Sequence, residues 1–331
     1  MADQVVNAGI SLTAPFWFFE DQLVRCYVPL DPSEYGQCEN KVCEVFRRVI
    51  VHSYGVPLII CAVPVALIGH VLMELGRCLG ASEIQHLVGT LPEKAVEAPK
   101  ILHLNTCMFP GSLSLHFGGM SPASSRVEAL VEWIVDQDAD IVMLSEVCDL
   151  IAGKLEEALS KYYAHFYSKI GVKPFGMGAS LFVASRIPPK RMEFTEFAVR
   201  AEGIQKHMKR GFVKIELADM VLFFTHLHPD DAKEDEEMRE AQFKEIKQAI
   251  EVVPGGKTVF LVGDLNTDYR QNNFLERHEL TWISPVEGED VEEGEFKDYI
   301  LSGSGKVDDF VVSYLGTKGL SDHPGVLVAP C

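Results

Sequence analysis

Short runs of apolar residues alternate with longer amphipathic segments from residue 101 to residue 331. Apolar runs of about four to eight residues predict buried strands, whereas apolar positions that recur every three or four residues predict helices. Helices are predicted over residues 126–136 and 231–251. The predicted strands cover residues 101–106, 140–145, 178–184, 212–217, 220–226, 258–262, 310–312 and 326–328. Because helices interleave with both adjacent and distant strands, we expect an α/β fold with two sheets flanked by helices.

The first hundred residues have a different character. Residues 56–73 form a stretch of 18 residues without Asp, Glu, Lys or Arg, close to the ~20 that a membrane helix needs. Pro57 and Pro64 interrupt the stretch, and membrane helices tolerate proline better than soluble helices do. The alternative is a buried helix or a strand pair in a small helical cap. We favour membrane attachment, as a span, a re-entrant segment or an interfacial helix.

A linker and the cysteine pattern complete the domain interpretation. Residues 91–100 carry prolines near both ends and no apolar period, which is typical of a linker. We therefore expect an N-terminal apolar appendage over residues 1–98 and a separate domain over residues 99–331. The eight cysteines include no CxxC pair, so we expect reduced thiols rather than a disulfide framework. The expected location is a membrane surface, or otherwise the cytoplasm.

The charge of the chain restricts its partners. The 30 basic and 48 acidic side chains give a formal net charge of −18. A field of this sign repels polyphosphates, so extended DNA or RNA is an unfavourable partner. A small phosphate ester remains compatible with it, because a bound metal ion can reverse the local sign.

Polar functional groups recur where the apolar strands end. Strand ends can aim side chains into a common cleft while the strands hold them in place. The residues at these ends are Asn105, Glu146, His226, His228, Asp264, Asn266, Asp308, Asp309, Asp322 and His323. Each of them alone has an ordinary structural interpretation as a cap, a turn residue or a satisfied histidine. Their joint occurrence in this order favours a catalytic site. Five other histidines, at positions 103, 116, 165, 207 and 278, are expected to be structural or exposed.

The chemistry of these groups suits a metal-dependent reaction on phosphate. The oxygen ligands of Glu146, Asn105 and Asp322 suit Mg²⁺ or Mn²⁺, which binds through few carboxylates and substrate phosphate. Histidines can transfer protons near neutral pH and donate hydrogen bonds to phosphate.

Several short motifs resemble those of the endonuclease/exonuclease/phosphatase superfamily. These metal-dependent phosphohydrolases share the deoxyribonuclease-I-like fold, which implies a four-layered α/β sandwich here. The resemblance covers residues 100–329. It is carried by Leu-Asn105-Thr, Ser-Glu146-Val, the segment 178–188, Arg210-Gly-Phe, Thr-His226-Leu-His228, Gly-Asp264-Leu-Asn266, Val-Asp308-Asp-Phe and Ser-Asp322-His323.

The resemblance implies a role for each acidic and amide group. Glu146 corresponds to the metal ligand, and Asn105 to an amide that faces metal or phosphate. Asp264 corresponds to the residue that orients or deprotonates the attacking water. Asn266 corresponds to the group that holds the transition-state oxygens, and Asp322 to a further metal-contacting member.

It also implies roles for the histidines. His226 resembles the histidine that binds phosphate or the leaving group, and Asp308 resembles the carboxylate that orients His323. The family pattern around that carboxylate reads Ile-Asp-Tyr-Ile, and Asp309 stands here in place of the aromatic residue. His228 and Arg210 are expected to contact the substrate.

Within the superfamily, the motifs are most similar to those of bacterial and animal neutral sphingomyelinases. The Trp-Cys-Asp-Arg block of inositol polyphosphate phosphatases is absent, as is the basic, aromatic-interleaved pattern of strand-tracking nucleases. The expected function is divalent-metal-dependent cleavage of a phospholipid headgroup at a membrane. The alternatives are a nuclease or small-molecule phosphatase of the same superfamily, and a non-catalytic membrane-attached binding protein.

Overall fold

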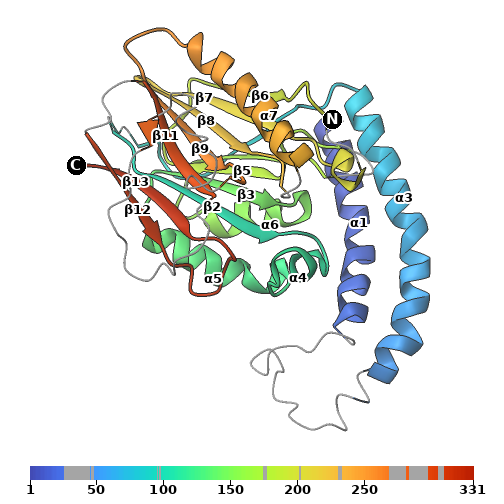
Figure 1. The fold of residues 1–331 in the computed structure, drawn as a ribbon. Coiled ribbons are helices and arrows are strands. Elements are labelled where there is room, and N and C mark those ends of the chain that lie inside the picture. The colour runs from blue at the N-terminus through green and yellow to red at the C-terminus, as the bar shows by residue number, and fades with distance from the viewer. Residues whose placement is uncertain are drawn as a thin grey trace. The chain divides into compact units, whose positions relative to one another are not determined.

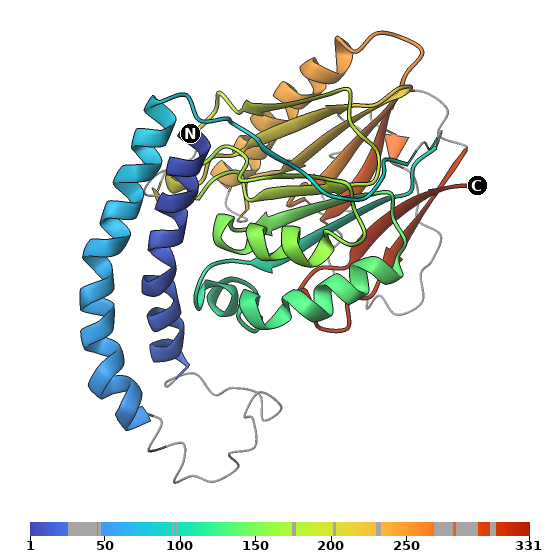
Figure 2. The same ribbon diagram turned by 180° about the vertical axis from the view of Figure 1, so that it is seen from behind.

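The structure is a computed structural model, and it describes residues 1–25, 45, 48–94, 96, 98–173, 177–200, 203–229, 233–267, 281–282, 297–304 and 309–331. The chain divides into two compact units. The smaller unit comprises Met1–Ser82 and Met108–Ser125, and the larger comprises Glu83–Cys107 and Arg126–Cys331. Figures 1 and 2 show the ribbon from opposite sides.

The larger unit contains two β-sheets. The seven-stranded sheet has the order β1 (Gln85–Val88), β4 (His165–Ser168), β5 (Leu181–Ser185), β3 (Ile141–Val147), β2 (Ile101–Met108), β13 (Gly325–Pro330), β12 (Phe310–Leu315). The six-stranded sheet has the order β10 (Thr281–Trp282), β11 (Asp298–Ser304), β9 (Thr258–Asp264), β8 (Met220–His226), β7 (Gly211–Glu216), β6 (Arg191–Glu196).

Helices cover the outer faces of both sheets. Helix α7 (Lys233–Glu251) lies along the six-stranded sheet, and α5 (Ala123–Asp136) and α6 (Asp149–Leu159) lie along the seven-stranded sheet (Figures 1 and 2). The result is the four-layered α/β sandwich that the resemblance implied.

Strand β8 shows why the inner strands are continuously apolar. Successive side chains of a strand point to opposite faces. Met220, Leu222 and Phe224 lie in the core between the two sheets. Val221 and Phe223 lie in the core beneath α7. Burying each such side chain contributes ~1.5–3 kcal/mol, so a strand with both faces covered has no place for alternating polar residues.

Each of the eight predicted strands and both predicted helices coincides with an observed element, with shifts of a few residues at the ends. The sequence pattern missed β1, β4, β6, β10 and β11. Strands β1 and β4 have only four residues each, and β6 is a largely exposed edge strand with alternating polar positions. Runs this short or polar do not stand out from loops.

The smaller unit contains an antiparallel pair of helices. Helix α1 (Ala2–Val24) packs on α3 (Val56–Cys78), which continues a π-helical turn η2 (Val51–Gly55). Gly9 meets Gly69 so closely that a Cβ on Gly9 would lie 2.5 Å from the Gly69 carbonyl oxygen. Nearer the start of α1, Val6 packs on Gly76. Small residues along α3 thus let the two backbones approach, as in helix pairs within membranes.

The opposite side of α3 is apolar and exposed. Its exposed large aliphatic residues are Val56, Leu58, Ile60, Val63, Leu67, Ile68, Val71 and Leu75. The continuous helix Arg48–Cys78 has 31 residues, which makes it long and apolar enough to cross a membrane by length and composition, and 22% of its most apolar part is buried. A core helix of a soluble protein would be mostly buried, and this one is not.

Candidate active site

Three neighbouring strands of the six-stranded sheet bring polar side chains together. Strands β8 and β9 are parallel, and their register places His226 opposite Asp264. Strand β11 runs antiparallel to β9, and its register places Asp298 opposite the same Asp264. Directly opposite residues share a face of the sheet. The sheet topology therefore places one imidazole and two carboxylates in a row.

The facing sheet contributes the remaining groups. Asn105 lies in β2, Glu146 lies near the end of β3, and His323 precedes β13. The Asn105 side-chain amide donates a hydrogen bond to Asp264 Oδ2 at 2.9 Å, which links the two sheets at the site. The structure thus brings together six of the predicted site residues: Asn105, Glu146, His226, Asp264, Asn266 and His323.

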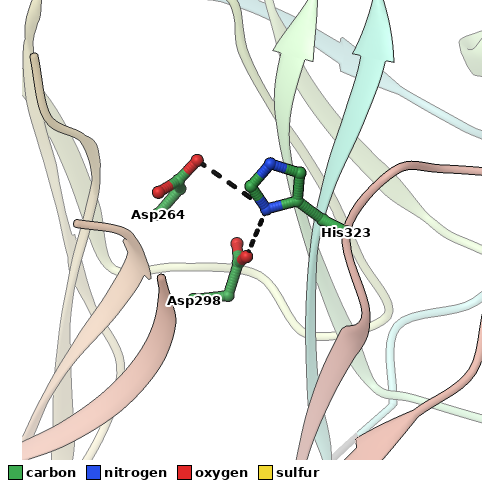
Figure 3. A group of neighbouring side chains, drawn as sticks. All are labelled: Asp264, Asp298 and His323. Carbon is green, nitrogen blue, oxygen red and sulfur yellow. Dashed lines mark hydrogen bonds and ion pairs between the residues drawn. The ribbon is translucent and has the colours of Figure 1, made fainter. Parts of the chain in front are cut away.

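His323 forms a close ion pair with Asp298 (Figure 3). Its Nδ1 donates to Asp298 Oδ2 at 2.6 Å and lies 4.0 Å from Asp264 Oδ2. Burial opposes protonation, but the charge and hydrogen bond of Asp298 outweigh it and raise the pKa of His323 to about 11. Burial likewise opposes ionisation of Asp298, and His323 reverses the effect, so the pKa of Asp298 lies well below its usual range. At neutral pH this pair is an imidazolium and a carboxylate.

The ligand atoms of Asp264, Asp298 and His323 all lie within 4.8 Å of one another, a spacing that could also suit a metal ion. A histidine that ligates a metal must be neutral, however. In the structure, His323 Nδ1 and Asp298 Oδ2 bond to each other at 2.6 Å, so we interpret this group as a hydrogen-bonded ion pair next to Asp264.

Asp298 was not among the residues expected from the sequence. The hydrogen-bond partner of His323 was expected to be Asp308, which lies outside the described residues, so its role stays a prediction. A signal for Asp298 was present: Asp298-Tyr299-Ile300 matches the Asp-Tyr-Ile part of the family pattern better than Asp308-Asp309 does. The strand that contains Asp298 follows the acidic segment 287–295 and was not predicted from the apolar runs.

Asp264 is held by both of its oxygens. Its Oδ2 accepts from Asn105, and its Oδ1 accepts from the backbone N–H of Asn266 at 2.8 Å. Asn266 has a φ of 49°, in the left-handed region, and its side-chain amide donates to the Leu227 carbonyl at 3.1 Å. Burial and the charge of Asp298 raise the pKa of Asp264. Such a carboxylate is oriented and more basic than usual.

Glu146 also has left-handed backbone geometry, with a φ of 59°. For a non-glycine residue such a conformation is strained and frequently functional. Burial raises the pKa of Glu146 to about 8, and the neighbouring charge of Asp264 adds to the rise. The side chain keeps 17% of its surface exposed, so an ion can reach it from solvent.

His226 supplies a test of whether the site fits a cation and a phosphate. Its Nε2 lies 3.7 Å from Glu146 Oε1 and 3.6 Å from Asp264 Oδ2. Both ring nitrogens are buried without a hydrogen-bond partner among the described residues. Burial lowers the pKa of His226 well below its usual range, and Arg210 adds to this effect. A neutral imidazole thus faces two carboxyl groups, and this set of oxygen and nitrogen atoms fits a site for a divalent metal and a bound phosphate.

The other expected residues lie around this cluster in different roles. Asp322 is exposed, and its charge raises the pKa of both Glu146 and His323. Arg210 donates to the carbonyls of His226 and Leu227 and so holds the end of β8. His228 bonds through Nε2 to Asp235 Oδ1 at 2.8 Å, on the segment that forms α7.

Arg126 is a further residue that the sequence did not single out. Its buried guanidinium donates to the carbonyls of Thr106, Cys107 and Leu320. It therefore ties the end of β2 to the loop that carries Asp322 and His323. A buried arginine in the first turns of α5 could have suggested this role, although its carbonyl partners could not be read from the sequence.

The site residues lie within a region that matches a known family. Residues 103–323, two-thirds of the chain, match the model of the Endonuclease/Exonuclease/phosphatase family. This protein belongs to that family. The family comprises metal-dependent phosphoesterases, so the protein is a hydrolase of phosphate esters. Comparison with curated protein sequences gives no match.

Solved structures share the fold at low identity. Sphingomyelinase C from Streptomyces griseocarneus is 19% identical, with a TM-score of 0.59, over 71% of this chain and all of that one. A mutant beta toxin from Staphylococcus aureus with bound magnesium ions is 18% identical, with a TM-score of 0.61, over 71% of this chain and all of that one. These similarities confirm the deoxyribonuclease-I-like fold.

Proposed function

We propose that this protein is a divalent-metal-dependent phosphodiesterase that cleaves the headgroup of a membrane phospholipid, in the manner of a sphingomyelinase. The observation that supports a lipid substrate is the exposed apolar side of α3. Along this side, a phosphoesterase chain exposes large aliphatic residues to solvent. An exposed apolar surface of this kind marks a membrane or protein interface. The Gly263-Asp-Leu-Asn-Thr-Asp268 and Thr225-His-Leu-His228 motifs support the same branch of the family.

Glu146, Asn105 and Asp322 would hold the metal ion, for which Mg²⁺ or Mn²⁺ is the candidate. Carboxylate and amide oxygens are the ligands that these ions prefer. Bound there, the ion would supply positive charge to polarise the substrate phosphate. It would also favour ionisation of Glu146, whose carboxyl group otherwise retains its proton near neutral pH.

Residues of the chain would activate the water and bind the phosphate. Asp264, held by Asn105 and Asn266, orients the attacking water and accepts its proton. The His323 imidazolium donates a hydrogen bond to a phosphate oxygen as negative charge develops there. His226 has unused ring nitrogens that face the same space and can donate to the phosphate or to the leaving oxygen.

Membrane attachment is the second part of the proposal. The helix Arg48–Cys78 would place its exposed side in the lipid, while the small residues on its other side pack on α1. Long stretches of both helices contain no charged side chain: residues 4–19 of α1 and residues 49–73 of the helix Arg48–Cys78. Attachment would hold the catalytic unit at the surface that contains its substrate.

The test is a substrate panel with the full chain in mixed micelles. Sphingomyelin, phosphatidylcholine, plasmid DNA and inositol phosphates are each incubated with Mg²⁺, and again with a chelator. We expect release of phosphocholine from one of the two lipids, only with the metal. Cleavage of DNA or of inositol phosphates in preference to both lipids would overturn the lipid assignment, and activity that persists in chelator would overturn the metal assignment.

A further inference from the structure

His103 is a fully buried histidine next to the site, on β2 two residues before Asn105. Its Nε2 lies 2.8 Å from Asp298 Oδ1, and its Nδ1 lies 3.1 Å from the Met143 carbonyl oxygen. The ring edge packs on Phe224. The same Asp298 carboxylate accepts from His323 through its other oxygen, Oδ2. One carboxylate is therefore shared by two imidazoles.

Both ring nitrogens of His103 have a partner that fixes the orientation of the ring. An ionised carboxylate only accepts hydrogen bonds, so Nε2 donates to Asp298. On the other side of the ring, Nδ1 lies within hydrogen-bond distance of the Met143 carbonyl oxygen. The Asp298 carboxylate is thus held from two sides by hydrogen bonds that its own charge strengthens. Such bonds are short and about twice as strong as neutral ones.

Packing of the core does not require a histidine at position 103. A buried polar group costs free energy unless it is hydrogen-bonded, and an aliphatic side chain would suit this apolar interior at lower cost. With an aliphatic residue, however, Asp298 Oδ1 would lose its partner, and the carboxyl group could turn about its Cβ–Cγ bond. The direction of Oδ2, and with it the orientation of the His323 ring, would then be less restricted.

We propose that His103 is a positioning residue, which orients Asp298 so that Asp298 aims His323 at the substrate phosphate. His103 itself is buried and does not touch the substrate. The three residues come from three separate segments, β2, β11 and the loop before β13, so the chain His103–Asp298–His323 also joins the two sheets behind the site.

The test uses two isosteric replacements that separate the two hydrogen bonds. In His103→Gln the amide nitrogen can take the place of Nε2 and donate to Asp298. In His103→Asn the amide nitrogen can take the place of Nδ1 and donate to Met143, but it leaves Asp298 without a partner. His165→Gln is the control, because His165 is a buried histidine of the same sheet whose ring contacts His86 and Glu93.

We expect His103→Asn to lower kcat by about 10–100-fold with KM within about twofold, the size of loss seen when a supporting hydrogen bond is removed. His103→Gln should restore most of kcat, and His165→Gln should leave kcat unchanged. This kinetic arm rests on the proposed function and uses whichever substrate of the panel is turned over.

A second measurement does not need a substrate. In protein with ¹⁵N-labelled histidine, the downfield proton on His323 Nδ1 is assigned as the signal lost in His323→Gln. We expect this signal to move upfield and to exchange faster with water in His103→Asn, and to stay in place in His103→Gln and His165→Gln. An unchanged signal in folded His103→Asn, or equal damage in the Gln and Asn variants, would overturn the proposal even if no substrate of the panel is cleaved.

Discussion

At the scale of single residues, the site is a group of carboxylates whose ionisation depends on one another. Asp298 is ionised because His323 is protonated beside it, whereas Asp264 and Glu146 hold their protons more tightly because each is buried near another negative charge. The environment thus separates chemically identical groups into different roles, as a site for acid and base chemistry requires.

Glu146→Gln tests the metal ligand. The substitution keeps the shape of the side chain and removes its charge, so we expect weaker binding of Mn²⁺ and at least about a 100-fold loss of turnover. Isothermal titration calorimetry with Mn²⁺ measures the first effect and substrate turnover the second. Glu132→Gln is the control, because Glu132 is exposed on α5. Wild-type metal affinity in Glu146→Gln would contradict the assignment.

Glu146 also predicts a pH dependence of stability without metal. Its pKa is about 8 in the folded protein, above the ordinary value of 4.5. Between these values the folded state keeps a proton that the unfolded state has lost, so rising pH lowers the free energy of unfolding, by at most ~1.4 kcal/mol per pH unit. Denaturant titrations in chelator should show wild type losing stability relative to Glu146→Gln from pH 5 to about 8. A constant difference would refute the raised pKa.

Asp298 and His323 should behave as a unit. Asp298→Asn and His323→Ala are each expected to lower turnover by about 10²–10⁴-fold, and the double substitution should cost scarcely more than either, because groups that act together are non-additive. Asp309→Ala is the control, since Asp309 is exposed. Asp308→Ala belongs in the same series. If it is the damaging change and Asp298→Asn is mild, Asp308 and not Asp298 orients the histidine in solution.

At the scale of secondary-structure elements, the close approach of β8 and β9 at Gly263 places the row of site residues. Gly263 has a φ of 151°, and a Cβ there would lie 2.0 Å from the Thr225 carbonyl oxygen. Any side chain would therefore force apart the two strands that carry His226 and Asp264.

Gly263→Ala should lower the free energy of unfolding by about 2–4 kcal/mol, through overpacking and backbone strain, and should reduce turnover as well. Gly255→Ala is the matched control, because a Cβ at Gly255 meets nothing within 4 Å. Chemical denaturation monitored by circular dichroism measures both variants. Equal stability of the two would show that β8 and β9 can separate without cost.

At the scale of the whole molecule, the proposed function requires an acidic chain of net charge −18 to bind at a phosphate-bearing membrane surface. The net charge opposes this binding, so the proposal relies on two local features: the metal ion at the site and the apolar side of α3. Membrane binding through the apolar side of α3 should persist at high salt, because burial of apolar surface is not screened by ions.

Membrane attachment is tested in the full chain. Replacing Ile68 and Val71, which are exposed on α3, by Lys should release the protein from liposomes, whereas wild type should stay bound after a high-salt wash. Val252→Lys is the control, because Val252 is exposed outside the helix pair. Co-sedimentation gives the bound fraction. A wild-type chain that remains in the supernatant without detergent would contradict the membrane proposal.

The sequence by itself determined those features that depend on local pattern. Apolar runs marked eight strands, because a strand buried on both faces must be apolar throughout. Short motifs at their ends identified most of the residues that meet in the site, because a motif places its polar group directly after its own strand.

Only the tertiary structure decided how the groups pair. His103 was expected to be an ordinary structural histidine, yet it contacts Asp298, which lies 195 residues further along the chain. Asp298 itself was missed, and its place opposite Asp264 follows from the antiparallel register of β11 on β9. Register depends on which strands become neighbours, and that choice is made by packing of the whole core and not by any one segment. In the smaller unit, packing on α1 covers one side of α3 and leaves the other side exposed. The apolar sequence of residues 56–73 does not show which side is covered.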